Sequence, residues 1–249
     1  MNNRNDQKPE APEIAGQSRF LRWLDNLWYH YKWPIIIGAF AVFALAVCLA
    51  QCSSRQKYDV NITFAGAKIL NNTEQEGLCS ALEAVMPADF DGNGAKAVQL
   101  VTYGIFTEEE LLQLYSSVNS EGVRVVDQFA YGNARKQSVD EGTSFSTYVK
   151  TGECAVWFVS PYVYETYNLS LLAAPLADVF GSQPESAADE FTVRLGDTAF
   201  YRYYSVVRVL PEDTLILLTQ PYIYGKTHNE NTYADFREMF KAIVEFRAP

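Results

Sequence analysis

The stretch Cys154-Ala-Val-Trp-Phe-Val159 is a run of six apolar residues in the middle of a more polar region. Gly152 lies just before it and Pro161 just after it, and both residue types commonly mark the ends of regular elements. A short apolar run without alternation is typical of a strand that other elements cover on both faces. This stretch therefore predicts an inner strand of a layered sheet, with Trp157 in the core.

Strand and helix patterns alternate on both sides of this run. Residues 58–64 alternate apolar and polar side chains, which is the pattern of a half-buried strand. The spacings Thr73-x-x-Glu76 and Thr107-x-x-Glu110 each predict the capped start of a helix. Such alternation predicts an α/β fold in which a mixed sheet is flanked by helices. Further strands are expected at 98–105, 123–129, 191–195, 200–210 and 214–219, and further helices over 136–150 and from Thr232 onward.

A second apolar run, Ile35–Ala50 (IIIGAFAVFALAVCLA), has sixteen residues and no charge. With its neighbours from Trp33 to Cys52 it reaches twenty residues, and a helix that crosses a bilayer needs roughly 20. Aromatic residues gather on its N-terminal side, as they do at membrane interfaces. They are Trp23, Trp28, Tyr29, Tyr31 and Trp33, with Lys32 among them. We therefore expect a transmembrane helix over 34–52.

Basic residues on the two sides of this run set its expected orientation. Arg19, Arg22 and Lys32 precede it, and Arg55 and Lys57 follow it, which favours a cytoplasmic N-terminus. The expected order along the chain is a disordered cytoplasmic tail (1–18), an aromatic and basic juxtamembrane segment (19–33), the transmembrane helix (34–52), a linker (53–57) and an extracytoplasmic α/β domain (58–249) at the bacterial cell surface.

The same segment has features of two cleaved signals. Cys48-Leu-Ala50 has the small residues of a cleavage site, but the region before the apolar run is longer than in a signal peptide. Leu49-Ala-Gln-Cys52 resembles a lipoprotein motif, but Gln51 stands where that motif has a small residue. The sequence favours an uncleaved single-pass anchor.

Composition narrows the range of functions. The 249 residues carry 20 Lys+Arg against 30 Asp+Glu, a net charge of −10, and no basic tract, which argues against a nucleic-acid partner. The part after the apolar run has one histidine, His228, and the chain lacks the motifs of serine hydrolases, zinc proteases and nucleotide-binding enzymes. No catalysis is expected. A carboxylate pair that cleaves glycosidic bonds leaves no local motif, so a hydrolase of envelope polymers stays an alternative.

Two segments share the pattern Pro-Tyr-aliphatic-Tyr, at 161–164 and 221–224. Alternate residues of an extended segment point to the same side, so each pair of tyrosines can form a platform of two rings. Such rings suit sugars, peptides and other amphipathic ligands. The alternative is that they pack across strands. The candidate ligand-binding residues are Tyr162, Tyr164, Tyr222 and Tyr224.

The segment Asp89-x-Asp91-x-Asn93-Gly94 matches the first half of a calcium-binding loop. The twelfth position of that loop is Leu100 in place of a glutamate. An acidic, glycine-rich turn explains the same residues without a metal. Asp89, Asp91 and Asn93 are the candidate calcium ligands, and no other cofactor is expected.

Two cysteines, Cys79 and Cys154, lie outside the apolar run near the start of the chain. In an oxidising compartment they can form one disulfide. They can equally serve as small buried side chains, because one falls in a helix pattern and the other in a strand pattern. Neither belongs to a spacing typical of zinc sites.

Residues 145–161 (FSTYVKTGECAVWFVSP) resemble part of an extracytoplasmic solute-binding protein. In that family a helix, a Gly-containing turn, a buried strand and a Ser/Pro turn recur beside the ligand cleft. The strand at 58–64 and the turn before 98–105 also fit a lobe of such a protein. The resemblance implies a periplasmic-binding-protein-like lobe, shortened and divergent, that captures a small molecule for a membrane permease.

These features lead to one function hypothesis and one alternative. The hypothesis is a single-pass, membrane-anchored domain that binds a small or extended ligand outside the cytoplasm. The alternative is an accessory or scaffold module of a membrane complex that has no small-molecule ligand. A concave pocket lined by both Pro-Tyr segments would favour the first.

Overall fold

The computed structural model describes residues 19–53, 57–223 and 226–248. The chain divides into two compact units, Met1–Gln56 and Lys57–Pro249. The tail expected over 1–18, residues 54–56 of the expected linker and the candidate ligand-binding residue Tyr224 lie outside the described residues.

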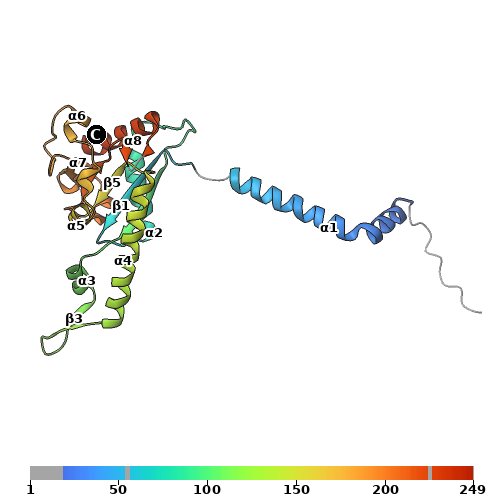
Figure 1. Cartoon of the computed structure of the whole chain (residues 1–249), viewed down its shortest axis with the longest axis horizontal. Coiled ribbons are helices and arrows are strands. Elements are labelled where there is room, and N and C mark those ends of the chain that lie inside the picture. Colours follow the sequence, from blue (N-terminus) through green and yellow to red (C-terminus); the bar gives the residue numbers. More distant parts are fainter. Residues whose placement is uncertain (1–18, 54–56, 224–225, 249) are drawn as a thin grey trace, which may run out of the picture. The chain divides into compact units, whose positions relative to one another are not determined.

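In the first unit the described residues form one long helix, α1 (Arg19–Ser53) (Figure 1). Its segment Tyr31–Leu49 has 19 residues and a mean hydropathy of 2.1. Large apolar side chains of this segment, such as Phe40 and Phe43, are exposed. The segment is long and apolar enough to cross a bilayer, as a membrane anchor or a signal sequence does. Both segments expected from the sequence, 19–33 and 34–52, lie within α1.

The second unit contains the mixed sheet and its helices. In chain order its elements are β1 (Val60–Gly66), α2 (Asn72–Val85), β2 (Val98–Gly104), α3 (Glu108–Leu114), β3 (Ser116–Val118), β4 (Arg124–Val126), α4 (Gln128–Thr151), β5 (Val156–Val159), α5 (Pro161–Thr166), η1 (Leu169–Leu171), α6 (Leu176–Phe180), β6 (Thr192–Arg194), η2 (Leu195–Asp197), α7 (Ala199–Tyr203), η3 (Ser205–Val209), β7 (Leu215–Leu218), β8 (Tyr222–Ile223), β9 (Lys226–Thr227) and α8 (Glu230–Val244).

The main sheet has five strands in the order β2-β1-β5-β7-β6. β1 is parallel to both β2 and β5, whereas β7 is antiparallel to β5 and to β6. The expected inner strand is therefore β5, at the centre of the sheet. All four of its residues are buried, because elements cover the sheet on both faces.

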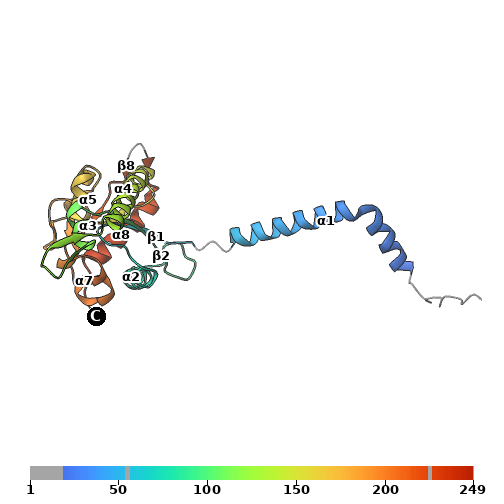
Figure 2. The ribbon, with the colours of Figure 1, turned by 90° about the horizontal axis from the view of Figure 1, so that it is seen from below.

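Two core clusters lie on the two faces of the sheet. One includes Phe64 of β1, Leu82 of α2 and Phe240 of α8. The other includes Trp157 of β5 and Phe145 of α4. Helices α2 and α8 therefore cover one face and α4 covers the other (Figures 1 and 2). The expected α/β architecture with a mixed sheet and flanking helices is confirmed.

The strand expected over 200–210 is wrong, because this segment forms α7 and η3. The Thr198 side chain accepts a hydrogen bond from the Tyr201 backbone N–H and so caps α7. Phe200 and Val207 are fully buried, and with Tyr204 between them they follow a spacing of four and three residues. That spacing is helical, and the many tyrosines concealed it in the sequence pattern.

An arm, residues 108–139, leads away from the sheet and contains α3, the β3/β4 hairpin and the first half of α4 (Figure 1). The helix that Thr107 caps ends at Leu114, because Ser116–Val118 pairs with Arg124–Val126. The strand expected to reach Phe129 ends at Val126. There the Asp127 side chain accepts a hydrogen bond from the Ala130 backbone N–H and begins α4 earlier than expected.

The sequence predicts where three helices start, and the structure confirms one of these starts. Thr107 and Glu110 form the expected capping box of α3. For α2 the expected box is wrong, because Asn71 and Glu74 form it, two residues earlier. α8 begins after Asn229 and not at Thr232. In both cases an asparagine nearer the preceding loop supplies the side-chain acceptor.

Candidate functional site

The first Pro-Tyr segment is helical and not extended. Ser160 caps α5 by accepting a hydrogen bond from the Val163 backbone N–H, and Pro161 occupies the first helical turn. Residues two apart on a helix lie on different sides. Tyr162 is 42% exposed, whereas Tyr164 packs against the core cluster that contains Trp157. The expected two-ring platform does not form there.

Tyr164 is turned toward the protein. Burial, and after it the nearby Asp189 carboxylate, raise the pKa of its hydroxyl above the ordinary value. Tyr162 instead lines a cavity of about 460 Å³ at the carboxyl ends of the parallel strands, together with Ile105, Phe106 and Tyr167. We call this cavity the carboxyl-edge pocket. Its role in ligand binding stays a prediction.

The second Pro-Tyr segment lies at the opposite end of the strands from the first, near the amino-terminal end of β5. Leu218, the last residue of β7, pairs with Val156, the first residue of β5. Tyr222 follows β7 and therefore lies near the amino-terminal edge of β5, whereas Tyr162 follows the carboxyl-terminal end of β5. Tyr222 is 60% exposed and lines a different cavity. Among the described residues, the two Pro-Tyr segments line no common pocket.

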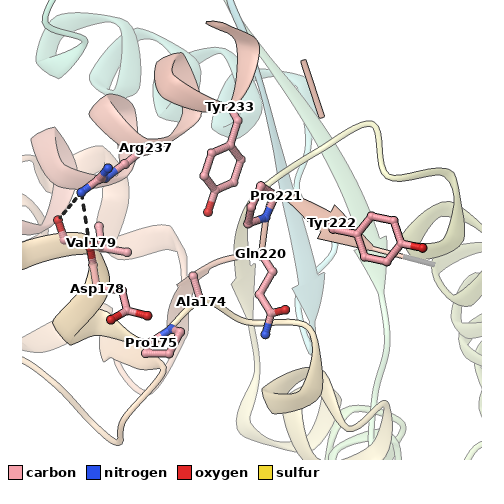
Figure 3. A pocket seen from close by; sticks show the side chains of 9 residues that line it. All are labelled: Ala174, Pro175, Asp178, Val179, Gln220, Pro221, Tyr222, Tyr233 and Arg237. Carbon is pink, nitrogen blue, oxygen red and sulfur yellow. Dashed lines mark hydrogen bonds between the residues drawn. The ribbon is translucent and has the colours of Figure 1, made fainter. Parts of the chain in front are cut away.

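Two neighbouring cavities, each of about 490 Å³, lie at the amino-terminal edge of β5. They share Pro221, Tyr233 and Arg237 as wall residues, and we call the pair the Tyr233 site. One cavity is also lined by Ala174, Pro175, Asp178, Val179, Gln220 and Tyr222 (Figure 3). The other is also lined by Thr227, His228, Glu230, Ala234 and Glu238.

Helix α8 supplies the central residues of this site. Tyr233 and Arg237 are four residues apart, so they lie on the same side of the helix. The Tyr233 hydroxyl donates a 2.8 Å hydrogen bond to the Thr219 carbonyl, just after β7. Burial raises the pKa of Tyr233 to about 12, so the hydroxyl keeps its proton at neutral pH.

Arg237 binds backbone rather than a carboxylate. One of its terminal nitrogens, Nη2, donates hydrogen bonds to the carbonyls of Asp178 and Val179 in α6, at 3.3 and 3.1 Å (Figure 3). These bonds attach α8 to the last turn of α6, where a cation is favourable. Within the described residues, Arg237 forms no ion pair, and its buried Nε has no hydrogen-bond partner.

Buried polar atoms without hydrogen-bond partners gather around Tyr233. In the described part of the chain they include Thr219 Oγ1, His228 Nε2 and Arg237 Nε. The imidazole of His228 lies 6.0 Å from the Tyr233 ring and 5.8 Å from the Phe236 ring, measured between centroids. Buried polar groups are normally paired with protein or with water. This edge of the sheet therefore offers hydrogen-bonding capacity that the protein itself does not use.

The burial of His228 predicts that the stability of the second unit depends on pH. Burial lowers the pKa of its imidazole below the ordinary 6.5, because the charged form loses hydration. The folded protein therefore binds this proton less readily than the unfolded chain. The stabilisation is complete above the unfolded pKa and is lost as the pH falls through the folded pKa.

We expect residues 57–249 to lose stability between pH 7.5 and 5.5 more steeply than the same unit carrying His228→Gln. Urea unfolding at several pH values measures this difference. His228 is the only histidine in this unit by sequence, so its imidazole is the residue that the variant isolates. Parallel pH profiles for the two proteins would show that burial does not disfavour the charged imidazole.

The acidic turn places its carboxylates close together. Oxygen atoms of Asp59, Asp89 and Asp91 lie within 4.8 Å of one another. Asp89 accepts hydrogen bonds from the Gly92 and Gly94 backbone N–H groups, and that from Gly94 is the main reason why its pKa is lowered.

Asn93 is not the third member of this cluster. Its side-chain carbonyl accepts a hydrogen bond from the Ala95 N–H, and its amide donates to Asp91. The third member is Asp59, which precedes β1 and lies outside the stretch that matches a calcium-binding loop. The hydrogen bonds account for these carboxylates as turn-forming groups, and a calcium role for Asp89, Asp91 and Asn93 stays a prediction.

The two cysteines of the second unit do not pair. Cys79 and Cys154 are both free. Cys154 is fully buried, and burial raises the pKa of its thiol to about 12. For Cys154 the structure supports the interpretation as a small buried side chain, whereas Cys79 is half-buried.

The central residues of the Tyr233 site were absent from the sequence-based candidates. Only Tyr222 belongs to both sets, whereas Tyr233, Arg237 and Gln220 come together through packing of α8 and α6 against the end of β7. The one local signal is the four-residue spacing of Tyr233 and Arg237. Comparison of the chain with protein-family models, with curated proteins and with solved structures finds no match in any of the three.

Proposed function

We propose that this chain is a membrane-anchored, non-catalytic binding domain that holds a small organic ligand reversibly at the Tyr233 site. α1 is the uncleaved anchor, the N-terminus is cytoplasmic and the second unit is extracytoplasmic. The ligand is handed to a permease or another membrane complex, as the resemblance to solute-binding proteins implies. The observation that carries the proposal is the set of unpartnered buried polar atoms around Tyr233.

The chemistry of this site suits an amphipathic ligand. The Tyr233 and Tyr222 rings and Pro221 provide apolar surface, and aromatic rings bind the faces of sugars and other ring-containing molecules. Arg237 and His228 provide unpaired nitrogen atoms. A few polar groups among apolar walls is the usual composition of a small-molecule site. Asp178 lines one cavity and Glu230 lines the other, and their carboxylates can accept hydrogen bonds from cationic or hydroxyl groups of the ligand.

Three polar side chains of the carboxyl-edge pocket already form hydrogen bonds within the protein. Ser138 already accepts a hydrogen bond from the Phe106 N–H. Thr143 and Thr147 donate to carbonyls of their own helix, α4. Open α/β sheets usually bind ligands at this edge. The buried polar atoms without partners around Tyr233 favour the opposite edge in this protein.

Residues 57–249 have their own core and can be produced alone for a ligand screen. We expect a sugar, amino acid, short peptide or organic acid to raise the melting temperature of this unit. A ligand at 100 times its Kd adds about 2.7 kcal/mol to the stability. Differential scanning fluorimetry detects such a change. A screen in which no class produces a shift contradicts the proposal.

Two variants locate the binding site. We expect Arg237→Gln to reduce the ligand-induced shift strongly, because it removes the charge and the buried Nε donor of Arg237. We expect Tyr162→Ala, in the carboxyl-edge pocket, to leave that shift unchanged. The opposite pattern would assign binding to the carboxyl-edge pocket and refute the Tyr233 site.

The arm favours a second candidate function, an accessory module of a membrane complex. Phe129 is 81% exposed and Val118 is 69% exposed, and Leu114, Val123 and Val125 are exposed as well. Exposed apolar patches of this kind mark protein interfaces. Hydrogen bonds also fix α3 against α4 within the arm, because Glu108 of α3 accepts them from Tyr131 and Arg135 of α4.

This second function predicts that the extracted protein is part of a larger particle. Solubilised from membranes in mild detergent, the wild-type chain is expected to migrate above the size of one 28.1 kDa chain in its micelle. The double variant Val118→Ser, Phe129→Ser is expected to migrate as the single chain. A matched change on exposed polar residues of the same arm, Gln113→Ser with Asn133→Ser, should leave the particle intact. Equal migration of all three as single chains refutes the accessory role.

A further inference from the structure

The first part of α1 has two chemically different sides. At 3.6 residues per turn, the positions Phe20, Trp23, Leu24, Leu27 and Tyr31 fall on one side of the helix. Leu21 and Trp28 border this side on one flank, and Arg19 and His30 border it on the other. The remaining positions from 19 to 33 fall on the opposite side, and with the exception of Trp33 and Tyr29 they are polar or charged: Arg22, Asp25, Asn26 and Lys32. The apolar run that follows has no such division.

A proline separates the two parts of α1. Pro34 lies inside the helix and has no N–H to donate to the carbonyl of His30, and its ring crowds that carbonyl. Prolines are a principal cause of sharp bends in helices. Figures 1 and 2 both show α1 bent, with the part toward Arg19 at an angle to the part toward Ser53. A helix that loses a backbone donor in this way is tolerated best where water or polar headgroups can bind the carbonyl, because hydrocarbon offers no donor.

The charge of the first part suits a lipid surface. Residues 19–33 carry three basic side chains, Arg19, Arg22 and Lys32, and one acidic side chain, Asp25, in a chain whose net charge is −10. Trp28 and Tyr31, whose side chains the structure describes, are both exposed. Tryptophan and basic residues on opposite sides of a helix are typical of helices that lie in the membrane interface.

We propose that Arg19–Trp33 is an in-plane helix that lies on the membrane surface, with its apolar side in the acyl boundary, and that Pro34 turns the chain from this surface into the bilayer. This inference rests on the anchoring part of the proposed function. The partner is the lipid bilayer, on the side where the N-terminus lies. The in-plane helix fixes the depth of the anchor, because it continues through Pro34 directly into the apolar run that spans the bilayer.

Site-directed spin labelling of the full chain tests this arrangement. The native cysteines are replaced by alanine, and single nitroxide labels are placed at each position from 20 to 32 and at Ala44. The protein is reconstituted in vesicles of phosphatidylcholine and phosphatidylglycerol. We expect labels at 20, 24, 27 and 31 to collide with oxygen, at similar depths, and labels at 22, 26 and 29 to collide with an aqueous nickel chelate. The two collision rates should alternate with a period of 3.6 residues.

Other patterns overturn the inference and are distinguishable from a failure of the anchor. If Ala44 is in hydrocarbon and all positions from 20 to 32 contact nickel, the helix projects into water and the anchor stands. If the depth changes steadily from 31 to 20, the segment continues along the axis of the span. If Ala44 itself contacts nickel, the anchor fails and the in-plane helix fails with it.

Paired substitutions in the same vesicles provide the matched control. Leu24→Asp with Leu27→Asp places carboxylates on the apolar side, and we expect the label at 20 to move from the oxygen-accessible to the nickel-accessible class. Asn26→Asp adds one carboxylate to the polar side, and there the label should stay in its class. If both changes move the label equally, charge alone governs the position of the segment and the amphipathic arrangement is refuted.

Discussion

Replacing Trp157 with alanine is expected to lower the free energy of unfolding of residues 57–249 by about 4 kcal/mol. Trp157 lies at the centre of β5 and is 1% exposed. Its ring packs edge-on against Phe145 of α4, with centroids 6.1 Å apart. The indole Nε1 donates a 3.2 Å hydrogen bond to the Cys154 carbonyl. The substitution removes the largest buried side chain of the unit. It leaves a cavity between the sheet and α4, which cannot easily move together to fill it.

Urea unfolding followed by tyrosine emission measures this loss, because the variant has no tryptophan left in residues 57–249. Trp157→Phe is the matched control, since it keeps an aromatic ring in the core and removes only the hydrogen bond and part of the volume. We expect it to cost clearly less than the alanine variant. A cost below about 1 kcal/mol for Trp157→Ala would mean that the site collapses freely and that β5 is not the central packed strand.

The identity of β5 could be predicted because it depends on local composition. A short apolar run between Gly152 and Pro161 becomes a covered strand with few alternatives, and Trp157 in it becomes a core residue. The capping box at Thr107 is likewise local, since all its partners lie within four residues. Where the determining interactions are close in sequence, the residue pattern is sufficient.

The direction of a strand is not a local property, and this is why the described parts of the two Pro-Tyr segments line no common pocket. The two Pro-Tyr segments follow strands of similar composition, but β7 runs antiparallel to β5. The two turns therefore lie at opposite edges of the sheet. α5 also shows that a serine before Pro161 is enough to begin a helix where the alternation of tyrosines suggested an extended chain.

The Tyr233 site depends on tertiary packing throughout. Arg237 lies on α8, its hydrogen-bond acceptors lie on α6, and the Tyr233 hydroxyl reaches the end of β7. The acceptors are backbone carbonyls, which carry no sequence information. No residue pattern could have placed these three elements together, whereas the amphipathic start of α1, with its period of 3.6 residues, is readable directly.

Asp59 illustrates a second kind of interaction that the sequence conceals. Its carboxylate accepts three backbone hydrogen bonds across the chain: Oδ1 from Phe90 and Asp91, at 2.8 and 3.0 Å, and Oδ2 from Ala97, at 2.8 Å. The backbone N–H of Asp59 donates to the Ala97 carbonyl. One side chain at the start of β1 therefore holds both ends of the acidic turn, and this turn leads directly into β2.

We expect Asp59→Ala to destabilise residues 57–249 by about 3 kcal/mol, because hydrogen bonds to a charged acceptor are worth about 1.5–3 kcal/mol each and water replaces part of them. The measurement is urea unfolding in EDTA, so that a bound cation cannot contribute. Asp91→Ala is the matched control: among the residues that the structure describes, its carboxylate accepts from the backbone and side chain of Asn93, within the same turn, so its cost should be much smaller. Equal costs for the two variants would show that the turn is stabilised by its own residues and not by its attachment to β1. A cost that appears only when calcium replaces EDTA would instead assign the three carboxylates to a metal.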